Sequence, residues 1–348
     1  MQTLDRRTFL TLSAGTMAGL AILRPDRACA ALADARLEAF PSTRAGKTYF
    51  TWHELRDGAW AAVDLSLGGN SLILHDSGHS LLIDTKFPAL GAALVREGSG
   101  LGLDTPAPVT TIINTHHHGD HTSGNAVAHP GAKIIAHQRA AERIGEQFDK
   151  YLRMTKGAAD MVDSDRDRAD AVRKEANAAA AHASDLLPAD FVPDETIDTW
   201  PHAMHFGTSA IVLHAVGPGH TDNDLFVQFN KQNIIHSGDL CFHKLHPFFD
   251  PNGGASCKGW IKSLEYMIPL CDDDTIVVPG HGELTDKQGL IEQKAYLEAL
   301  YAHVAREVHA GTPKAKVAAM SWDFMDGLGF EQIKSRAIEA CYDEVMEE

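Results

Sequence analysis

The sequence predicts an α/β protein. Short apolar runs with strand character alternate with longer segments of helical periodicity along most of the 348 residues. Several of these apolar runs are followed by a histidine or aspartate beside a glycine. Burying unpaired titratable groups costs free energy, so these residues indicate a functional site rather than core packing. A chain of this length can bury a sizeable core, as one large domain or as two ordinary ones.

The first 30 residues have the features of a targeting segment and are expected to lie outside the folded domain. Arg6 and Arg7 precede an apolar stretch over residues 9–23, and Ala28-Cys29-Ala30 fits a small-x-small cleavage site. The stretch is too short and too rich in Gly, Ser and Thr to be a good membrane span, so we expect no stable span after its removal. The arginine pair and the Phe-Leu that follows resemble a twin-arginine export signal, with an ordinary secretory signal as the alternative. We therefore expect a periplasmic or otherwise exported protein whose fold lies within residues 31–348.

Charge and cysteine content exclude some classes of function. The formal net charge of −16 argues against nucleic-acid binding, which needs a positive surface, and leaves a small molecule as the expected partner. Beyond the targeting segment the chain has four cysteines whose spacing indicates neither a zinc knuckle nor an identifiable disulfide framework. They are expected to be small buried hydrophobes, and any pairing among them stays open: Cys241, Cys257, Cys271 and Cys341.

The first chemical motif follows an apolar run over residues 109–113 that predicts a buried strand. In an extended segment the side chains at i and i+2 point the same way, so His116 and His118 can bind one ion. A turn at Gly119 then lets Asp120 and His121 face a second ion. Imidazoles and carboxylates suit zinc, iron or manganese.

Three later residues share the same setting, after a strand-like run and beside a glycine. They are His220 in Gly-Pro-Gly-His, Asp239 in Ser-Gly-Asp, and His281 in Pro-Gly-His-Gly. Ahead of the first motif, residues 71–74 and 80–85 predict a hairpin whose second strand ends in Asp84.

In this order the residues resemble the ligand series of the metallo-β-lactamase fold superfamily, over about residues 45–310. The resemblance implies a four-layer αββα sandwich with metals at one edge of the two central sheets. It implies that His116, His118 and His220 hold a first ion, that Asp120, His121 and His281 hold a second, and that Asp239 bridges them. Cys241 is an alternative ligand near Asp239, although Ser-Gly-Asp fits the family pattern better. Asp84 is expected to orient the metal loop or an imidazole.

The function that this resemblance implies is a dinuclear metal-dependent hydrolase. Two divalent ions, zinc first and iron or manganese as alternatives, would activate a bridging hydroxide toward an ester, thioester, lactone, amide or phosphodiester bond. Asp120 would orient the hydroxide and receive or relay its proton. His243 and Lys244 follow Asp239 on a loop and are candidates to bind an anionic part of the substrate.

Other functions remain open within the same superfamily. A bridging aspartate resembles glyoxalase II, lactonases and phosphodiesterases, and zinc β-lactamases generally lack it, so Asp239 disfavours an antibiotic-hydrolysing role. A mononuclear iron sulfur dioxygenase is the oxidoreductase alternative. A non-catalytic binding module is disfavoured because all the candidate ligands are intact.

Two helical segments interrupt or follow the predicted sandwich. Within an insertion over about residues 138–190, the four-residue spacing from Ala140 to Leu152 predicts one amphipathic helix, and residues 169–187 predict a second. The insertion could be a lid over the metals, or a packed hairpin or dimer surface. Residues 287–348 are expected to be C-terminal helices, and the oligomeric state is left open.

Overall fold

The computed structural model describes residues 47–128 and 131–348. The predicted targeting segment, residues 1–30, lies outside the described residues. Among the helices of the described ranges, none has the length and apolar character needed to cross a membrane.

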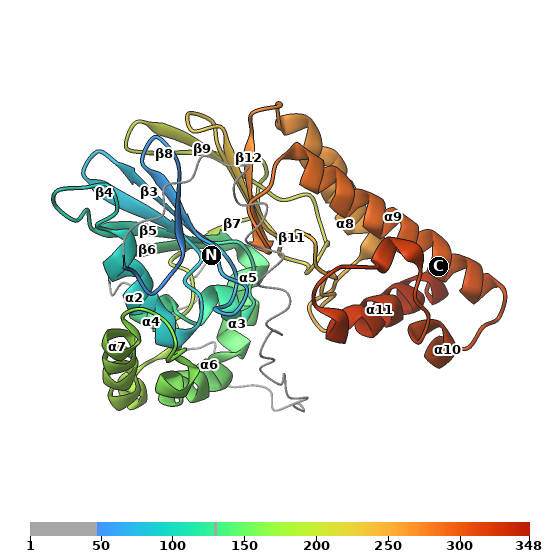
Figure 1. Cartoon of the computed structure of the whole chain (residues 1–348), viewed down its shortest axis with the longest axis horizontal. Helices are drawn as coiled ribbons and strands as arrows, with labels where there is room; N and C mark the ends of the chain where they lie inside the picture. Colours follow the sequence, from blue (N-terminus) through green and yellow to red (C-terminus); the bar gives the residue numbers. More distant parts are fainter. Residues whose placement is uncertain (1–46, 129–130) are drawn as a thin grey trace, which may run out of the picture.

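Two β-sheets lie face to face and helices cover their outer sides, which gives the expected four layers (Figure 1). The first sheet has seven strands in sequence order, and the second has five in the order β12-β11-β10-β9-β8. The first sheet contains β1 (Trp52–Arg56), β2 (Ala59–Ala62), β3 (Ser71–Asp76), β4 (His79–Ile83), β5 (Val109–Asn114), β6 (Lys133–His137) and β7 (Glu195–Ile197). The second contains β8 (His202–Phe206), β9 (Ser209–His214), β10 (Phe226–Phe229), β11 (Ile234–Phe242) and β12 (Ile276–His281).

Successive side chains along a strand point to opposite faces of the sheet, so strands buried on both faces contribute to two hydrophobic cores. In β4, Leu81 and Ile83 join the core between the sheets, whereas Leu82 faces the helices of the first layer. The neighbouring strand β5 repeats this division with Ile113 and Ile112. Because both faces of these strands are buried, apolar residues stand next to one another in them, over Leu81–Ile83 and Ile112–Ile113, rather than alternating with polar residues.

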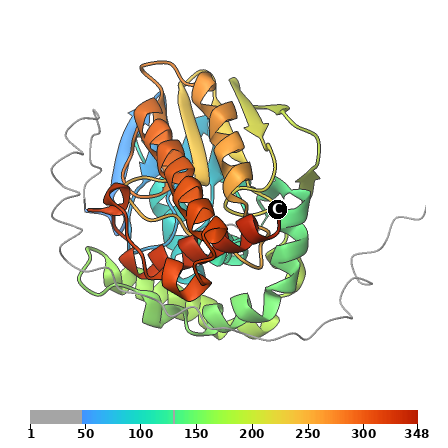
Figure 2. The same ribbon diagram turned by 90° about the vertical axis from the view of Figure 1, so that its right-hand side faces the viewer.

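The helices form the two outer layers (Figures 1 and 2). On the first sheet the cover includes α2, α4, α6 and α7, and on the second sheet α8 and α9 lie side by side, with α11 against α9. Their bounds are α2 (Pro88–Gly98), α3 (Gly119–Thr122), α4 (Asn125–Ala128), α5 (Gln138–Glu146), α6 (Phe148–Lys156), α7 (Ala169–Ala181), α8 (Cys257–Met267), α9 (Lys287–His309), α10 (Lys314–Ala318) and α11 (Lys334–Met346).

The insertion differs from its prediction in two respects. The second helix, expected over residues 169–187, ends at Ala181 and is followed by a 3-10 turn over Ala183–Asp185. The single helix expected from Ala140 to Leu152 is two helices, α5 and α6, which meet at Gln147, whose φ of −93° and ψ of 5° interrupt the helical geometry. Both helices contribute to one small core, but the spacing shifts at the break: Ala140, Ile144 and Tyr151 are buried in it, whereas Leu152, the expected position, is only partly buried. A periodic pattern reports which face is buried, and it cannot report a local bend in the backbone.

Parallel strands bring the chemical motifs to one edge of the sandwich. β4 and β5 run parallel in the first sheet, and β11 and β12 run parallel in the second. The carboxyl ends of parallel neighbours meet at one edge, so Asp84 and the residues after Asn114 lie together. In the second sheet β11 runs to Phe242, through an irregularity at Gly238 with φ of 52°, and carries Asp239 to the same edge.

Asp76 joins the far ends of the two sheets. Its carboxylate, at the end of β3, accepts hydrogen bonds from Ser209 Oγ at 2.7 Å and from the Thr208 amide at 3.1 Å, both in the β8–β9 turn region of the other sheet. Burial raises the pKa of Asp76, but the hydrogen bonds from Ser209, Ser77 and Thr208 outweigh it and hold the pKa well below the usual range.

We expect Asp76→Asn to lower the free energy of unfolding by about 1 kcal/mol at pH 7, because an amide accepts these hydrogen bonds more weakly than a carboxylate. A carboxyl group whose pKa is depressed by folding stabilises the protein above its unfolded pKa of about 4, and this contribution is lost as the pH falls through the folded value. The difference between variant and wild type should therefore shrink between pH 7 and pH 3 in urea unfolding. Asp57→Asn, in the exposed β1–β2 turn, is the control. An equal difference at both pH values would contradict the assignment.

Candidate metal centre

The loop after β5 supplies four of the candidate ligands. Thr115, His116 and His117 continue from the strand end, and His118 then caps the short helix α3 in an extended conformation, with φ of −67° and ψ of 147°. The turn expected at Gly119 is thus the first residue of this helix, which presents Asp120 and His121 beside the first two histidines. His220 arrives on the β9–β10 loop, and Asp239 and His281 arrive on β11 and β12.

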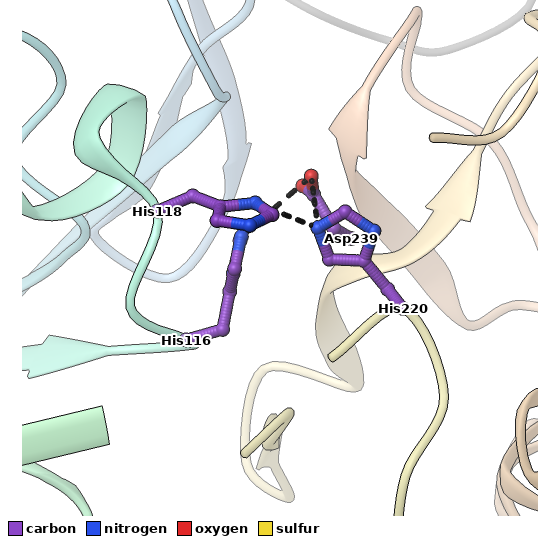
Figure 3. A group of neighbouring side chains, drawn as sticks. All are labelled: His116, His118, His220 and Asp239. Atoms are coloured by element: carbon purple, nitrogen blue, oxygen red, sulfur yellow. Dashed lines mark hydrogen bonds and ion pairs between the residues drawn. The ribbon is translucent and has the colours of Figure 1, made fainter. Parts of the chain in front are cut away.

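Four side chains form the first group of donors: His116, His118, His220 and Asp239. They point toward one another from both sheets (Figure 3). His220 Nε2 lies 2.9 Å from His118 Nδ1 and 3.3 Å from Asp239 Oδ2, and His116 Nε2 lies 3.7 Å from the same oxygen. These donors are within reach of a single ion.

The second group contains Asp120, His121 and His281. His281 Nε2 lies 3.3 Å from Asp120 Oδ2 and 3.4 Å from His121 Nε2. Asp239 also touches this group, with Oδ1 3.1 Å from His121 Nε2 and Oδ2 3.4 Å from His281 Nε2. The Asp239 carboxylate therefore lies between the two groups, where the family resemblance places the bridging ligand.

The bonding of these atoms fits cations rather than a closed hydrogen-bond network. His116 Nε2 and Asp239 Oδ1 are buried, and neither makes a hydrogen bond. Two pairs of ring nitrogens face each other, His220 with His118 and His121 with His281, although each pair has only one position for a shared proton. Buried polar atoms without partners are costly, and a bound cation satisfies all of these lone pairs at once. The donor set of imidazoles and carboxylates thus fits divalent metal ions.

The donors differ in their protonation states at neutral pH. Burial lowers the pKa of His116 well below its usual value and that of His220 to about 3, so both rings are neutral and able to bind a cation. Burial acts in the same direction on His281, but Asp239 and Asp120 outweigh it and raise its pKa to about 9. Burial would raise the pKa of Asp239, yet the surrounding histidines lower it well below the usual range. A metal at the second group must therefore displace protons, which makes its binding pH-dependent.

Asp84 makes hydrogen bonds to the loop after β5. Its Oδ2 lies 2.7 Å from His121 Nδ1 and accepts a hydrogen bond from Thr115 Oγ1 at 2.7 Å, and its Oδ1 accepts one from the Thr115 amide at 2.9 Å. Thr115 Oγ1 in turn lies 3.0 Å from His116 Nδ1. These contacts occupy the Nδ1 atoms of both histidines and leave Nε2 of each to face the cluster.

Asp250 is a site residue that the sequence did not reveal. Its Oδ2 lies 2.9 Å from His118 Nε2 and 3.4 Å from His117 Nε2. Because Asp250 engages Nε2, His118 presents Nδ1 to the first group, unlike the other histidines. The only local signal is an aspartate before Pro-Asn-Gly, which indicates a turn and nothing more. His117, between His116 and His118 in the chain, lies against Asn223 and Asp250.

Two glycines allow the close approach of backbone to the cluster. A Cβ atom at Gly69 would overlap the His121 ring, and one at Gly280 would overlap the Asp239 carboxylate. Neither position can carry a side chain without displacing a candidate ligand. Gly280, which precedes His281, is therefore required for close packing as well as for the turn.

The other candidates lie beside the cluster. His243 directs Nδ1 to the Glu283 carbonyl and Nε2 toward Thr285, and its amide donates to the His281 carbonyl at 2.9 Å. Lys244 follows it with φ of 59°. A substrate-binding role for these two residues stays a prediction. Cys241 is buried outside both donor groups, and the four cysteines of the described ranges are all free and buried.

The helical insertion contacts the metal loop directly. Tyr151 of α6 donates a hydrogen bond from its hydroxyl to the His117 carbonyl at 2.7 Å. Arg143 of α5 pairs with Asp222, and its Nη1 donates to the Asn252 carbonyl at 2.9 Å, close to Asp250. The insertion is therefore packed against the loops that carry the donors.

The cluster opens to solvent on one side. The side chains of Asp120, His118 and His281 are 27%, 16% and 10% exposed, whereas those of His116, His121, His220 and Asp239 are at most 3% exposed. Both donor groups thus keep a partly exposed member, and Asp120 is the most exposed.

Comparisons with known proteins agree with this geometry. A segment of 38 residues is 55% identical to a hydroxyacylglutathione hydrolase from Polaromonas sp., and this match spans 10% of the chain and 14% of that relative. Among solved structures, a metallo-beta-lactamase from Pontibacter korlensis aligns with a TM-score of 0.51 and 18% identity, over 72% of this chain and 99% of the other. The stereoselective inverting sec-alkylsulfatase Pisa1 from Pseudomonas sp. aligns with a TM-score of 0.61 and 14% identity, over 84% of this chain and 50% of the other.

At these identities the solved structures share the fold alone. The sequence profile of the Metallo-beta-lactamase superfamily matches residues 66–281, a range that contains all the donors of both groups. The chain therefore belongs to the metallo-β-lactamase superfamily.

Proposed function

We propose that this protein is a dinuclear metal-dependent hydrolase, with zinc as the expected metal, that cleaves an ester, thioester, lactone, amide or phosphodiester bond. The observation that carries the proposal is the position of Asp239 between two groups of donors, within 3.7 Å of a ring nitrogen in each. The short match to a hydroxyacylglutathione hydrolase supports a thioester as the first substrate to test. The paired arginines near the N-terminus support the further proposal that the enzyme acts after export.

Each donor group would hold one metal ion, with Asp239 shared between them. His116, His118 and His220 would hold one ion, Asp120, His121 and His281 the other, and Asp239 both. When bound, a pair of divalent ions lowers the pKa of water and polarises the bond to be cleaved. Asp84 and Asp250 fix the orientation of His121 and His118 through the ring nitrogens opposite the cluster.

Asp120 is the residue best placed to hold a proton during turnover. It is the most exposed of the donors, so its carboxylate meets both the cluster and solvent. Burial would raise its pKa, but His121 and His281 lower it well below the usual range, so the group is a carboxylate at neutral pH. A carboxylate there can accept a hydrogen bond from the attacking water and take its proton.

The purified mature protein should contain two zinc ions per chain by mass spectrometry of its metals. Removal of the metals with a chelator should abolish hydrolysis across a panel of thioester, lactone, β-lactam, phosphodiester and sulfate ester substrates, and zinc should restore it. One iron per chain together with oxygen uptake would instead identify the dioxygenase alternative.

Asp120→Asn should lower turnover by about a hundredfold, the scale of losing a general acid–base group, while the fold is retained. The metal content of the variant must be measured alongside, because Asp120 is also a donor of the second group. Asp149→Asn, an exposed carboxylate on α6, is the matched control and should turn over at the wild-type rate. Wild-type turnover in Asp120→Asn would rule out its role.

Asp250→Asn should weaken zinc binding at the first group by about 10- to 100-fold, because an amide no longer fixes the His118 tautomer that presents Nδ1. Titration of the metal-free protein with zinc, in competition with a chromophoric chelator, measures the effect. Asp222→Asn, which disturbs the neighbouring contact with Arg143 and leaves the carboxylate on His118 in place, should change the affinity less. Equal effects of the two substitutions on zinc affinity would contradict the proposal that Asp250 fixes the His118 tautomer.

A further inference from the structure

Phe330 is a strained residue in the C-terminal segment. Its φ of 62° and ψ of 35° place a bulky side chain in the left-handed region that favours glycine. A conformation of this kind is strained for a bulky residue and persists only when the surrounding structure holds it. The residue lies outside residues 66–281, the part of the chain that the superfamily profile matches.

Contacts on both sides of Phe330 hold it in place. The Gly329 amide donates to the Lys244 carbonyl, and the Gly329 carbonyl accepts from the His246 amide, both at 2.9 Å. On the other side, Glu331 Oε1 lies 3.4 Å from His246 Nε2. The loop that follows Asp239 and β11 thus fixes the residues before and after Phe330.

The Phe330 ring is held beside a candidate metal ligand. Its centroid lies 5.9 Å from that of His281, at an interplanar angle of 62°. The buried Phe242 stacks on the same imidazole at 5.1 Å, whereas Phe330 is only partly buried. A second partly buried phenylalanine, Phe248, lies 5.8 Å from His118 and 5.9 Å from His220. An aromatic ring that keeps solvent exposure therefore accompanies each donor group.

We infer that Phe330 is a specificity-determining residue, which forms an apolar wall beside the second donor group for a substrate with an apolar, preferably aromatic, group next to the bond that is cleaved. Such a group would cover the exposed part of the ring and gain the free energy of apolar burial. The inference rests on the proposed hydrolase function, and it narrows the substrate class to esters or thioesters with a hydrophobic acyl or leaving group.

The test uses two ligands that differ only in the apolar group, acetohydroxamate and phenylacetohydroxamate, with the zinc-loaded protein. The wild type should bind the phenyl compound more tightly, and Phe330→Gly should lower this preference by roughly tenfold, the scale of losing one good apolar contact. Glycine suits the positive φ, so this variant removes the ring without backbone strain. Phe330→Leu should restore part of the preference, because it returns apolar volume.

The control is Trp322→Leu, which alters another aromatic residue of the C-terminal segment, one whose ring contacts are His303 and Phe324. It should keep the wild-type preference. In a kinetic comparison, the KM of Phe330→Gly for a phenylacetyl thioester should rise by roughly tenfold relative to the acetyl thioester, with a smaller change in kcat.

The inference is overturned if folded, zinc-loaded Phe330→Gly keeps the wild-type preference, or if the wild type does not discriminate between the two hydroxamates. Should Phe330→Gly lose zinc, the comparison of Phe330→Leu with the wild type decides in the same way. Failure of the proposed function gives a different result: the wild type would bind both hydroxamates and hydrolyse neither thioester, and the binding preference would still test Phe330.

Discussion

The burial of Asp239 among four imidazoles is the constraint on which the rest of the site depends. A carboxylate taken out of water needs compensating charge, and here histidines from three separate segments of the chain supply it. Without cations, Oδ1 of Asp239 and Nε2 of His116 are left without hydrogen bonds, and two pairs of ring nitrogens compete for protons. The arrangement is satisfied when positive charge occupies the space between the donors.

The sandwich meets this constraint because strands of both sheets lead to the edge where the donors gather. Asp239 and His281 lie on parallel neighbours of the second sheet, and the histidine loop leaves β5 of the first. Asp84, at the end of the adjacent strand β4, reaches His121 and the Thr115 hydroxyl at the same time. Hydrogen bonds from Asp84 and Asp250 thus orient two of the histidines, so a substitution at either aspartate would act on a bound metal through a histidine.

The segments outside the sandwich act on the same edge. The insertion packs Tyr151 under the histidine loop, and the C-terminal segment holds Phe330 beside His281. Both additions approach loops that carry donors, and the central core between the sheets contains residues from neither. Within a fold that hosts several chemistries, such additions are where substrate preference can diverge without disturbing the ligands.

The local features of this protein could be predicted from its sequence. The strands β3 to β5, with the hairpin that ends in Asp84, and the loop of histidines follow from apolar runs and from spacing within a few residues, where covalent geometry limits the outcome. The later candidates could be named because a family resemblance ordered them, and only the fold shows that His220, Asp239 and His281 converge with the loop. Tertiary packing alone decided that α5 and α6 are separate, that Asp250 turns His118 to its Nδ1 atom, and that Phe330 adopts a positive φ. Each of these features depends on contacts between residues far apart in the chain, and such contacts produce no periodic pattern in the local sequence.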